Sequence, residues 1–410
     1  MNELPLVRPA PTGAAASRIV AWALWDFGAT AVNAIVVTFV FSVYLTGAVG
    51  DDLPGGTSPA SWLGRALALA GLVVALFAPV TGVLVDAPAR RRRALAVLTG
   101  VMVLLTAAMS LIRDDHRYLW PGLVLLACTA ACSELATVPY NAMLRDLSTP
   151  QTSGRVSGFG LAAGYFGSVL ALVVVYVGFI SGDGDTRGLL HLPTADGQNI
   201  RAAMLLVAAW FALFALPLLV TGPTPAREGR DRVGVLGAYR RIWQELRAEW
   251  RRDRNVIYYL GASAVFRDGL TGVFTFGAVL GVQVYGISAA DVLLFGIAAC
   301  VVAAGGSVLG GHADDRIGAK RVIVASLTAM IATGLTLLAC SGVVAFWILG
   351  LMLCLFIGPI LSSARNLMMQ MSARGKEGVT FGLYATAGRA ATFLAPWLFS
   401  VFIDLFDSVR

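Results

Sequence analysis

The chain alternates long apolar runs with short charged segments. Eleven runs are dominated by aliphatic residues, and each is long enough for a helix that rises about 1.5 Å per residue to cross a hydrocarbon core about 30 Å thick. None shows the short alternating pattern, about ten residues long, of outer-membrane strands. The pattern therefore predicts an all-α, multi-pass membrane protein. We expect spans near 19–46, 62–86, 94–112, 119–144, 156–181, 200–221, 256–285, 289–311, 320–341, 344–370 and 379–404.

The composition supports the same class. Hydrophobic residues make up 57% of the chain, above the roughly 45–50% of soluble domains. The first run follows a short polar arm without a small-residue cleavage site, so we interpret it as an anchor and not as a removed signal peptide. The five cysteines all lie within predicted spans, which favours packing over disulfides or a metal site. We expect no metal and no cofactor, and there is no G-x-x-x-x-G-K-[ST] loop for ATP.

The placement of arginine predicts the orientation. With the N-terminus on the cytoplasmic side, 22 of the 31 lysines and arginines fall on that side, as the positive-inside rule requires. The net charge of +7 is therefore a topology signal, and we expect membrane lipids and no nucleic acid as partners. Arginine outnumbers lysine 29 to 2, which indicates a GC-rich bacterial genome and hence the plasma (inner) membrane.

A polar linker divides the chain into two halves. We expect an N-terminal six-helix bundle at 1–221, a cytoplasmic linker at 222–255 and a C-terminal bundle at 256–410. Within the linker, apolar residues from Val235 to Trp250 recur every three or four positions, which predicts an amphipathic helix on the inner membrane surface. A docking helix for a partner protein is the alternative.

The two halves repeat each other. GVLVDAPARRRR at 82–93 can be laid over GGHADDRIGAKR at 310–321, so that Gly82 matches Gly310 and Asp86 matches Asp314. GRVSGFGLAAGYFGS at 154–168 can be laid over GVTFGLYATAGRAAT at 378–392, with Gly154 on Gly378. The two alignments keep the same order and have nearly the same offset, which predicts a duplicated helical bundle.

The charged loop at 310–321 resembles the G-x-x-x-D-x-x-G-[RK]-[RK]-like signature of major-facilitator transporters, which follows the second helix of each half. The resemblance implies two six-helix bundles related by a pseudo-two-fold axis, and a loop that closes the cytoplasmic side. The copy at 82–93 is looser, with Pro88 and Ala89 where a glycine is expected. The expected gate residues are Gly82, Asp86, Arg90, Arg91, Gly310, Asp314, Arg316, Gly318, Lys320 and Arg321.

A narrower resemblance covers nearly the whole chain. WALWDFGATAVNAIVVTFVFSVYL, ELATVPYNAMLRDLS and SSARNLMMQMSARGKEGVTFGLYATAGRAATFLAPWLF are similar to the vacuole-effluxer-like branch, which is related to the yeast autophagy-associated vacuolar amino-acid exporter. The family has twelve helices, whereas eleven spans are visible here. We therefore expect that the chain is cut short or that the last helix is absent.

Ionisable residues inside spans cost roughly 2.5–3.5 kcal/mol on insertion scales, which makes each a functional candidate. Glu134 is the first choice for a proton carrier, followed by Asp268 and Asp26. The intramembrane arginines are suited to a substrate carboxylate or phosphate. The alternative is a set of structural ion pairs. The predicted substrate and coupling residues are Asp26, Asn33, Glu134, Arg267, Asp268, Arg365 and Arg389.

Together these features predict a monomeric secondary active transporter and not an enzyme. We expect a small polar or amphipathic solute, with amino-acid-like molecules favoured, to move by alternating access with proton coupling; sodium remains open. The alternatives are a lipid or drug exporter of the same fold, a membrane-embedded enzyme acting on lipid, and a scramblase.

Overall fold

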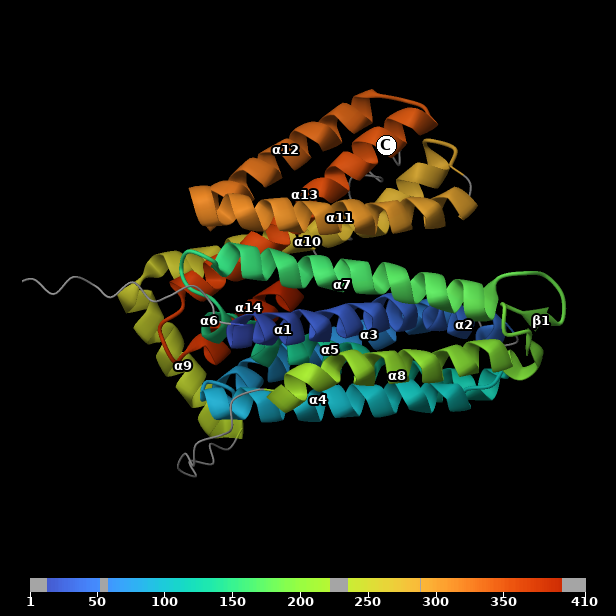
Figure 1. Ribbon diagram of the computed structural model, residues 1–410, viewed down its shortest axis with the longest axis horizontal. Coiled ribbons are helices and arrows are strands. Elements are labelled where there is room, and N and C mark those ends of the chain that lie inside the picture. Colours follow the sequence, from blue (N-terminus) through green and yellow to red (C-terminus); the bar gives the residue numbers. More distant parts are fainter. Residues whose placement is uncertain (1–12, 52–57, 222–234, 288, 393–410) are drawn as a thin grey trace, which may run out of the picture.

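The computed structural model describes residues 13–51, 58–221, 235–287 and 289–392. These residues are almost entirely helical, with one short antiparallel hairpin in which Thr186 pairs with Pro193 (Figure 1). The α-helices are α1 Gly13–Val32, α2 Phe41–Thr46, α3 Pro59–Leu84, α4 Pro88–Ala108, α5 Leu119–Ala142, α6 Leu144–Leu147, α7 Ser153–Val175, α8 Gln198–Thr221, α9 Val235–Arg252, α10 Arg254–Gln283, α11 Ala289–Ile317, α12 Ala319–Ala339, α13 Val343–Met371 and α14 Glu377–Ala391.

Shorter elements extend or connect these helices. Two π-helical segments continue α1 and α7 toward the hairpin. The short elements are η1 Asn33–Phe39, η2 Ala48–Gly50, η3 Met109–Leu111, η4 His116–Tyr118, η5 Tyr176–Ile180, η6 Ala195–Gly197, β1 Thr186–Arg187 and β2 Leu192–Pro193.

Within the described residues, nine helical segments are long and apolar enough to cross a membrane. The shortest, Ala319–Ala339, has 21 residues, which corresponds to about 32 Å of helix. The two other predicted spans coincide with α10 and with α14. The described part of α14 ends at Ala391, so the rest of the predicted eleventh span lies outside the described residues. The all-α, multi-pass fold predicted from the apolar runs is confirmed.

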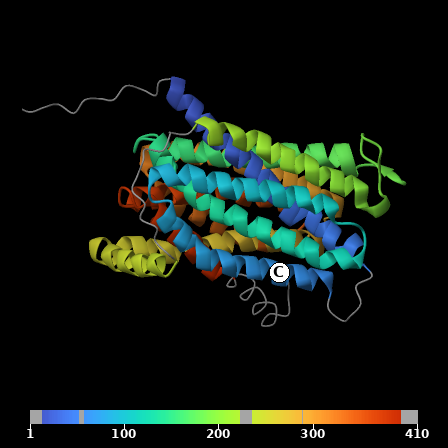
Figure 2. The same cartoon turned by 90° about the horizontal axis from the view of Figure 1, so that it is seen from below.

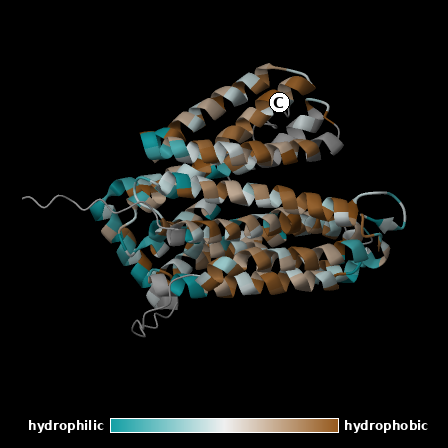
Figure 3. Ribbon diagram, in the orientation of Figure 1, coloured by the Kyte–Doolittle hydropathy of each residue, from teal (hydrophilic) through white to brown (hydrophobic). Residues whose placement is uncertain are grey.

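The helices gather into two lobes (Figure 1). Helices α1–α8 form the first lobe, and α10–α13 form most of the second. The lobes meet along two helix pairs, α7 with α11 and α3 with α14. We call the end of the bundle at which α9 lies the α9 end; the β1–β2 hairpin marks the opposite end. Figure 2 shows α9 at the same end, beside α3, and Figure 3 shows that hydrophilic residues gather there.

The core of the first lobe is built on aromatic stacking. The rings of Trp22 and Tyr140 are parallel with centroids 4.5 Å apart, and Trp25 lies on the same tyrosine at 4.6 Å. Each tryptophan N–H has an acceptor inside the lobe, since Trp22 donates to the Tyr140 carbonyl and Trp25 donates to Thr99. These bonds fix α1 against α4 and α5, and α1 carries Asp26 into the contact with the second lobe.

Candidate inter-lobe site

At the α9 end, α3 and α14 touch through two glycines. A Cβ atom added at Gly82 would lie 2.4 Å from the carbonyl oxygen of Gly378, and one at Gly378 would lie 2.3 Å from the carbonyl oxygen of Gly82. No side chain fits at such distances, because backbone cannot move aside as a flexible side chain can. The pair brings the end of α3 onto the first turn of α14.

The close approach places a carboxylate on a helix N-terminus. The Asp86 carboxylate Oδ1 accepts a hydrogen bond of 3.0 Å from the backbone N–H of Val379. Val379 is the third residue of α14, so its N–H has no acceptor within its own helix, and the helix dipole favours an acidic group there. The first copy of the signature loop thus contacts the other lobe through its aspartate.

Burial changes the titration of this carboxyl. Asp86 is 7% exposed, and burial raises its pKa to about 6. The Val379 N–H and the Arg241 and Arg91 guanidinium groups oppose the rise, while Glu245 adds to it. Arg241 of α9 lies 3.6 Å from Asp86 Oδ2, which is too long for a hydrogen bond.

Arg91 is the most deeply buried charged side chain among the expected gate residues. It is 1% exposed, and all five of its donor positions are used, as burial of a guanidinium requires. Three bonds go to carbonyl oxygens of Val85, Asp86 and Ala142. The other two reach carboxylates, one of Asp146 at 2.9 Å in the same lobe and one of Glu377 at 2.8 Å in the second lobe.

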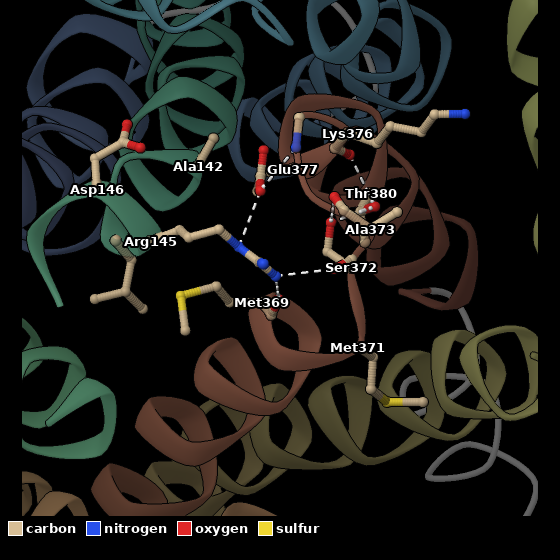
Figure 4. A network of polar contacts seen from close by, with 12 residues as sticks. Ala142, Arg145, Asp146, Met369, Met371, Ser372, Ala373, Lys376, Glu377 and Thr380 are labelled. Carbon is tan, nitrogen blue, oxygen red and sulfur yellow. Dashed lines mark hydrogen bonds and ion pairs between the residues drawn. The ribbon is translucent and has the colours of Figure 1, made fainter. Parts of the chain in front are cut away.

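Glu377 collects arginines from the first lobe. Besides Arg91, Arg145 lies 2.9 Å from Glu377 Oε1 and donates to the carbonyls of Met369 and Ser372 (Figure 4). The Glu377 side chain is 3% exposed, so both ion pairs lie away from water. Sequence reasoning missed this residue because it stands between Lys376 and a glycine in a loop that was interpreted only as positively charged. A signal was available, because an acidic residue in the first turn of a helix is stabilised by the helix dipole.

The second copy of the loop makes an equivalent contact one position later than predicted. Gly311, not Gly310, meets the other lobe: a Cβ on Gly311 would lie 2.6 Å from the carbonyl of Gly154. Asp315, not Asp314, accepts from the Gly154 N–H at 2.8 Å and from Arg155 Nε at 2.7 Å. In three dimensions the counterpart of Gly82 is therefore Gly311, and the counterpart of Asp86 is Asp315.

Gly310 and the carboxylate of Asp314 face their own lobe, whereas the Cβ of Asp314 lies beside Gly154 of the other lobe. A Cβ on Gly310 would lie 2.6 Å from Cα of Pro359 in α13, and Asp314 is buried near Ser363 and Asn366 of the same helix. The physical reason is the helical turn of about 100° per residue, which moves the next residue to another face. Gly310 and Asp314 stay predicted gate residues, and the hydrogen bonds between the lobes in this loop are made by Asp315.

The remaining signature residues have other surroundings. Gly318 joins α11 to α12 at a φ of 90°, a conformation that favours glycine. Arg316, Lys320 and Arg321 are exposed at the α9 end, and Arg90 is half-buried. In the first copy, by contrast, Arg91 is enclosed.

Deeper in the bundle, Glu134 and Arg389 form an ion pair between the lobes. Arg389 Nη2 of α14 lies 2.5 Å from Glu134 Oε1 of α5, and the two side chains are 31% and 30% exposed. Arg389 is the thirteenth residue of α14, about 18 Å from its start. The pair thus lies well inside the bundle, and neither side chain is fully buried.

Arg267 and Asp268 approach the same region from α10. Arg267 Nη1 donates to the carbonyl of Tyr384 at 3.1 Å, and its guanidinium lies 4.3 Å from the centre of the Tyr384 ring. A Cβ on Gly388 would lie 2.7 Å from Arg267 Nη1, so the glycine makes room for the arginine. Asp268 is 4% exposed.

Asp26 of α1 and Arg365 of α13 belong to a second polar cluster. Arg365 of α13 donates to the Ser157 hydroxyl at 3.0 Å and stacks 5.0 Å from the Trp22 ring. It also interacts electrostatically with Asp26, which accepts from Thr30 at 3.2 Å. This second polar cluster again joins the two lobes.

Asn33 does not join these residues. It is exposed and is the first residue of the π-helical segment η1. Within the described residues, no group of three or more His, Cys, Asp or Glu side chains is arranged to hold a metal ion.

Comparison with known proteins agrees with this architecture. The Major Facilitator Superfamily profile matches residues 26–396. An uncharacterized MFS-type transporter, YxiO of Bacillus subtilis, is 22% identical over 385 residues, which cover 94% of this chain and 88% of that protein. Autophagy-related protein 22 of Yarrowia lipolytica is 22% identical over 289 residues, which cover 63% of this chain and 47% of that protein.

Solved structures share the fold at low identity. The E. coli fucose:proton symporter FucP (N162A) aligns with a TM-score of 0.73 and 13% identity, over 97% of this chain and 94% of that one. The proton:xylose symporter XylE, bound to 6-bromo-6-deoxy-D-glucose, aligns with a TM-score of 0.68 and 15% identity, over 95% and 88%.

Two helical lobes joined by paired charged loops are the architecture of membrane transporters that are built from two repeated halves. The chain belongs to the Major Facilitator Superfamily. Family and fold point to a transporter of small molecules and not to an enzyme.

Proposed function

We propose that this protein is a proton-coupled secondary transporter of small zwitterionic, amino-acid-like solutes in the plasma membrane, with the α9 end in the cytoplasm. The observation that carries the proposal is the pair Glu134–Arg389, which joins the lobes well inside the bundle and keeps about a third of each side chain exposed.

A zwitterion is the natural competitor for such a pair. Its carboxylate replaces Glu134 on the fork of Arg389, and its ammonium group replaces Arg389 on Glu134. One bond between the lobes is exchanged for two bonds to the solute. A purely anionic or cationic solute would leave one of the two protein charges without a partner, which is costly in a site of low dielectric.

Protonation offers a second way to separate the pair. A neutral Glu134 attracts neither Arg389 nor the ammonium group of the solute, so a proton and the solute compete for this carboxylate and occupy the site in turn. Two transporters that share the fold, a fucose:proton symporter and a proton:xylose symporter, support the proton as coupling ion. By sequence, 22 lysines and arginines fall in the segments expected on the cytoplasmic side and six in those on the other side, which supports a cytoplasmic location for the α9 end.

The test is a thermal-stabilisation screen of the purified protein with amino acids, matched amines and matched carboxylic acids. We expect zwitterions to stabilise the wild type more than either analogue. Glu134→Gln gives the site one extra positive charge and should shift its preference to carboxylic acids, whereas Arg389→Gln should shift it to amines. Asp183→Asn, in an exposed loop at the opposite end, is the matched control.

The opposite result is equally clear. If lipids or apolar drugs stabilise the protein while amino acids do not, and neither variant changes the preference, the zwitterion proposal is wrong.

A further inference from the structure

Helix α9 is amphipathic, and one of its faces is bound to both lobes. Ile242 is 8% exposed and packs in a cluster with Val80 and Val379. On the same side, Glu245 pairs with Lys376 of the second lobe, and Arg241 lies near Asp86 of the first. These contacts all lie on one side of α9, and the other side of the helix does not take part in them.

A stripe of exposed aromatic rings runs along a second face. At about 100° per residue, Tyr239, Trp243 and Trp250 lie within about 40° of one another. They are 39%, 56% and 41% exposed, although aromatic side chains of this size are mostly buried in water-soluble proteins. The stripe therefore needs an apolar neighbour that is not part of the described chain.

The stripe continues the outer apolar surface of the membrane helices at both of its ends. Tyr239 donates to the carbonyl of Leu76 in α3, and α3 exposes Leu72, Leu76 and Phe77. Trp250 contacts the Tyr258 ring of α10 edge-on at 6.0 Å, and Tyr258 is 62% exposed. The stripe thus lies where the outward surfaces of the two lobes end.

A row of arginines borders the rings. Arg247 lies 5.1 Å from the Trp243 ring centre, and Arg254 lies 5.6 Å from that of Trp250. Arg240 and Arg251 are exposed on the same flank. Rings beside guanidinium groups suit the membrane interface, where the rings enter the headgroup level and the cations meet lipid phosphates.

We propose that α9 is a binding surface for anionic phospholipids, with the aromatic stripe in the headgroup boundary and the arginine row on the lipid phosphates. The net charge of the lipid matters because each arginine near an anionic surface contributes about 1 kcal/mol, or roughly fivefold in affinity. A soluble protein partner could bind the same aromatic stripe, and the experiment below distinguishes such a partner from anionic lipid.

The experiment uses the full-length protein in nanodiscs that contain brominated phosphatidylglycerol or brominated phosphatidylcholine, with tryptophan fluorescence as the signal. We expect stronger quenching by the anionic lipid, and a loss of that difference in the Trp243→Phe/Trp250→Phe variant. Arg240→Gln/Arg247→Gln/Arg251→Gln should raise the phosphatidylglycerol fraction needed for half-maximal quenching on the order of 100-fold, up to the limit of pure lipid.

The matched control neutralises three arginines at the opposite end. Arg65→Gln/Arg113→Gln/Arg117→Gln should leave the phosphatidylglycerol titration unchanged. Two results would overturn the proposal. One is equal quenching by both lipids in the wild type. The other is quenching of Trp243 and Trp250 by aqueous acrylamide and not by either lipid, which would assign the stripe to a soluble partner.

Discussion

Arg91 of the first lobe and Glu377 of the second form a hydrogen-bonded ion pair of 2.8 Å in which neither side chain is more than 3% exposed. Because both charges are enclosed, the pair exists only while the lobes are joined at the α9 end. A rocking motion that opens this end would expose both groups to water. The pair is therefore a state-specific bond and a direct target for mutation.

Glu377→Gln is expected to open the α9 end. Loss of the Glu377 charge leaves the buried Arg91 with only the half-exposed Asp146 as an acidic partner. Breaking a buried pair in this way costs about 3–5 kcal/mol, and the cost falls only on the joined state. Spin-label distances between α3 and α14 at this end should lengthen. Asp146→Asn is the control, because Asp146 also binds Arg91 but its side chain is 49% exposed, and such a pair contributes about 0–1 kcal/mol. Equal effects of both variants would contradict the assignment.

Gly82→Ala is expected to separate α3 from α14. The new methyl group would lie 2.4 Å from the Gly378 carbonyl oxygen, so the helices must move apart and the bond from Val379 to Asp86 must lengthen. Cross-linking of cysteines placed across this contact should fall several-fold. Gly100→Ala in α4 meets no atom within 4 Å and should leave cross-linking unchanged.

Asp86 should make the joined state sensitive to pH. Its pKa is about 6 in the joined state and returns to about 3.9 when the carboxyl reaches water. Between these values the joined state binds more protons, so it gains stability as the pH falls from 7 toward 4, by about 3 kcal/mol in total. Asp86→Asn keeps an oxygen for the Val379 N–H and should remove this dependence. Spin-label distances measured from pH 8 to pH 5 test it; separation of the lobes on acidification would contradict it.

The second gate contact can be tested by a charge exchange. Asp315→Arg should weaken the contact between α11 and α7, and Arg155→Asp in the same chain should restore it, because Arg155 Nε lies 2.7 Å from Asp315. Asp314→Asn should leave the distance between α7 and α11 unchanged. If Asp314 variants opened the lobes and Asp315 variants did not, the equivalence of Asp86 and Asp315 would be wrong.

The sequence predicted the helices better than the register of the charged loops between them. Apolar runs are long, and their length alone identifies a span. The loop at 310–321, however, has two adjacent glycines and two adjacent aspartates, so two alignments with the first copy, which differ by one position, both match a glycine and an aspartate. The spacing to Gly318 favours Gly311 and Asp315, because the signature has its second glycine three positions after the aspartate, and the packing of Gly311 against Gly154 agrees with this register.

The charged positions show the same limit. Charged residues are few in the apolar spans, which made Glu134 and Arg389 candidates. Their pairing could not be predicted, because the sequences of two separate helices do not give the distance between them. Asn33 was placed with them because it is an isolated polar residue in a predicted span, whereas in the structure it is exposed at the start of η1. Glu377 was missed because its partners, Arg91 and Arg145, lie in the other half of the chain.

The most direct measurement is proton movement in liposomes that contain the purified protein and an internal pH dye. Addition of a zwitterionic amino acid identified in the screen should change the internal pH in the wild type and in Asp183→Asn, and should fail to do so in Glu134→Gln. A pH change of the same size in Glu134→Gln, or amino-acid uptake in the wild type without any pH change, would contradict the account.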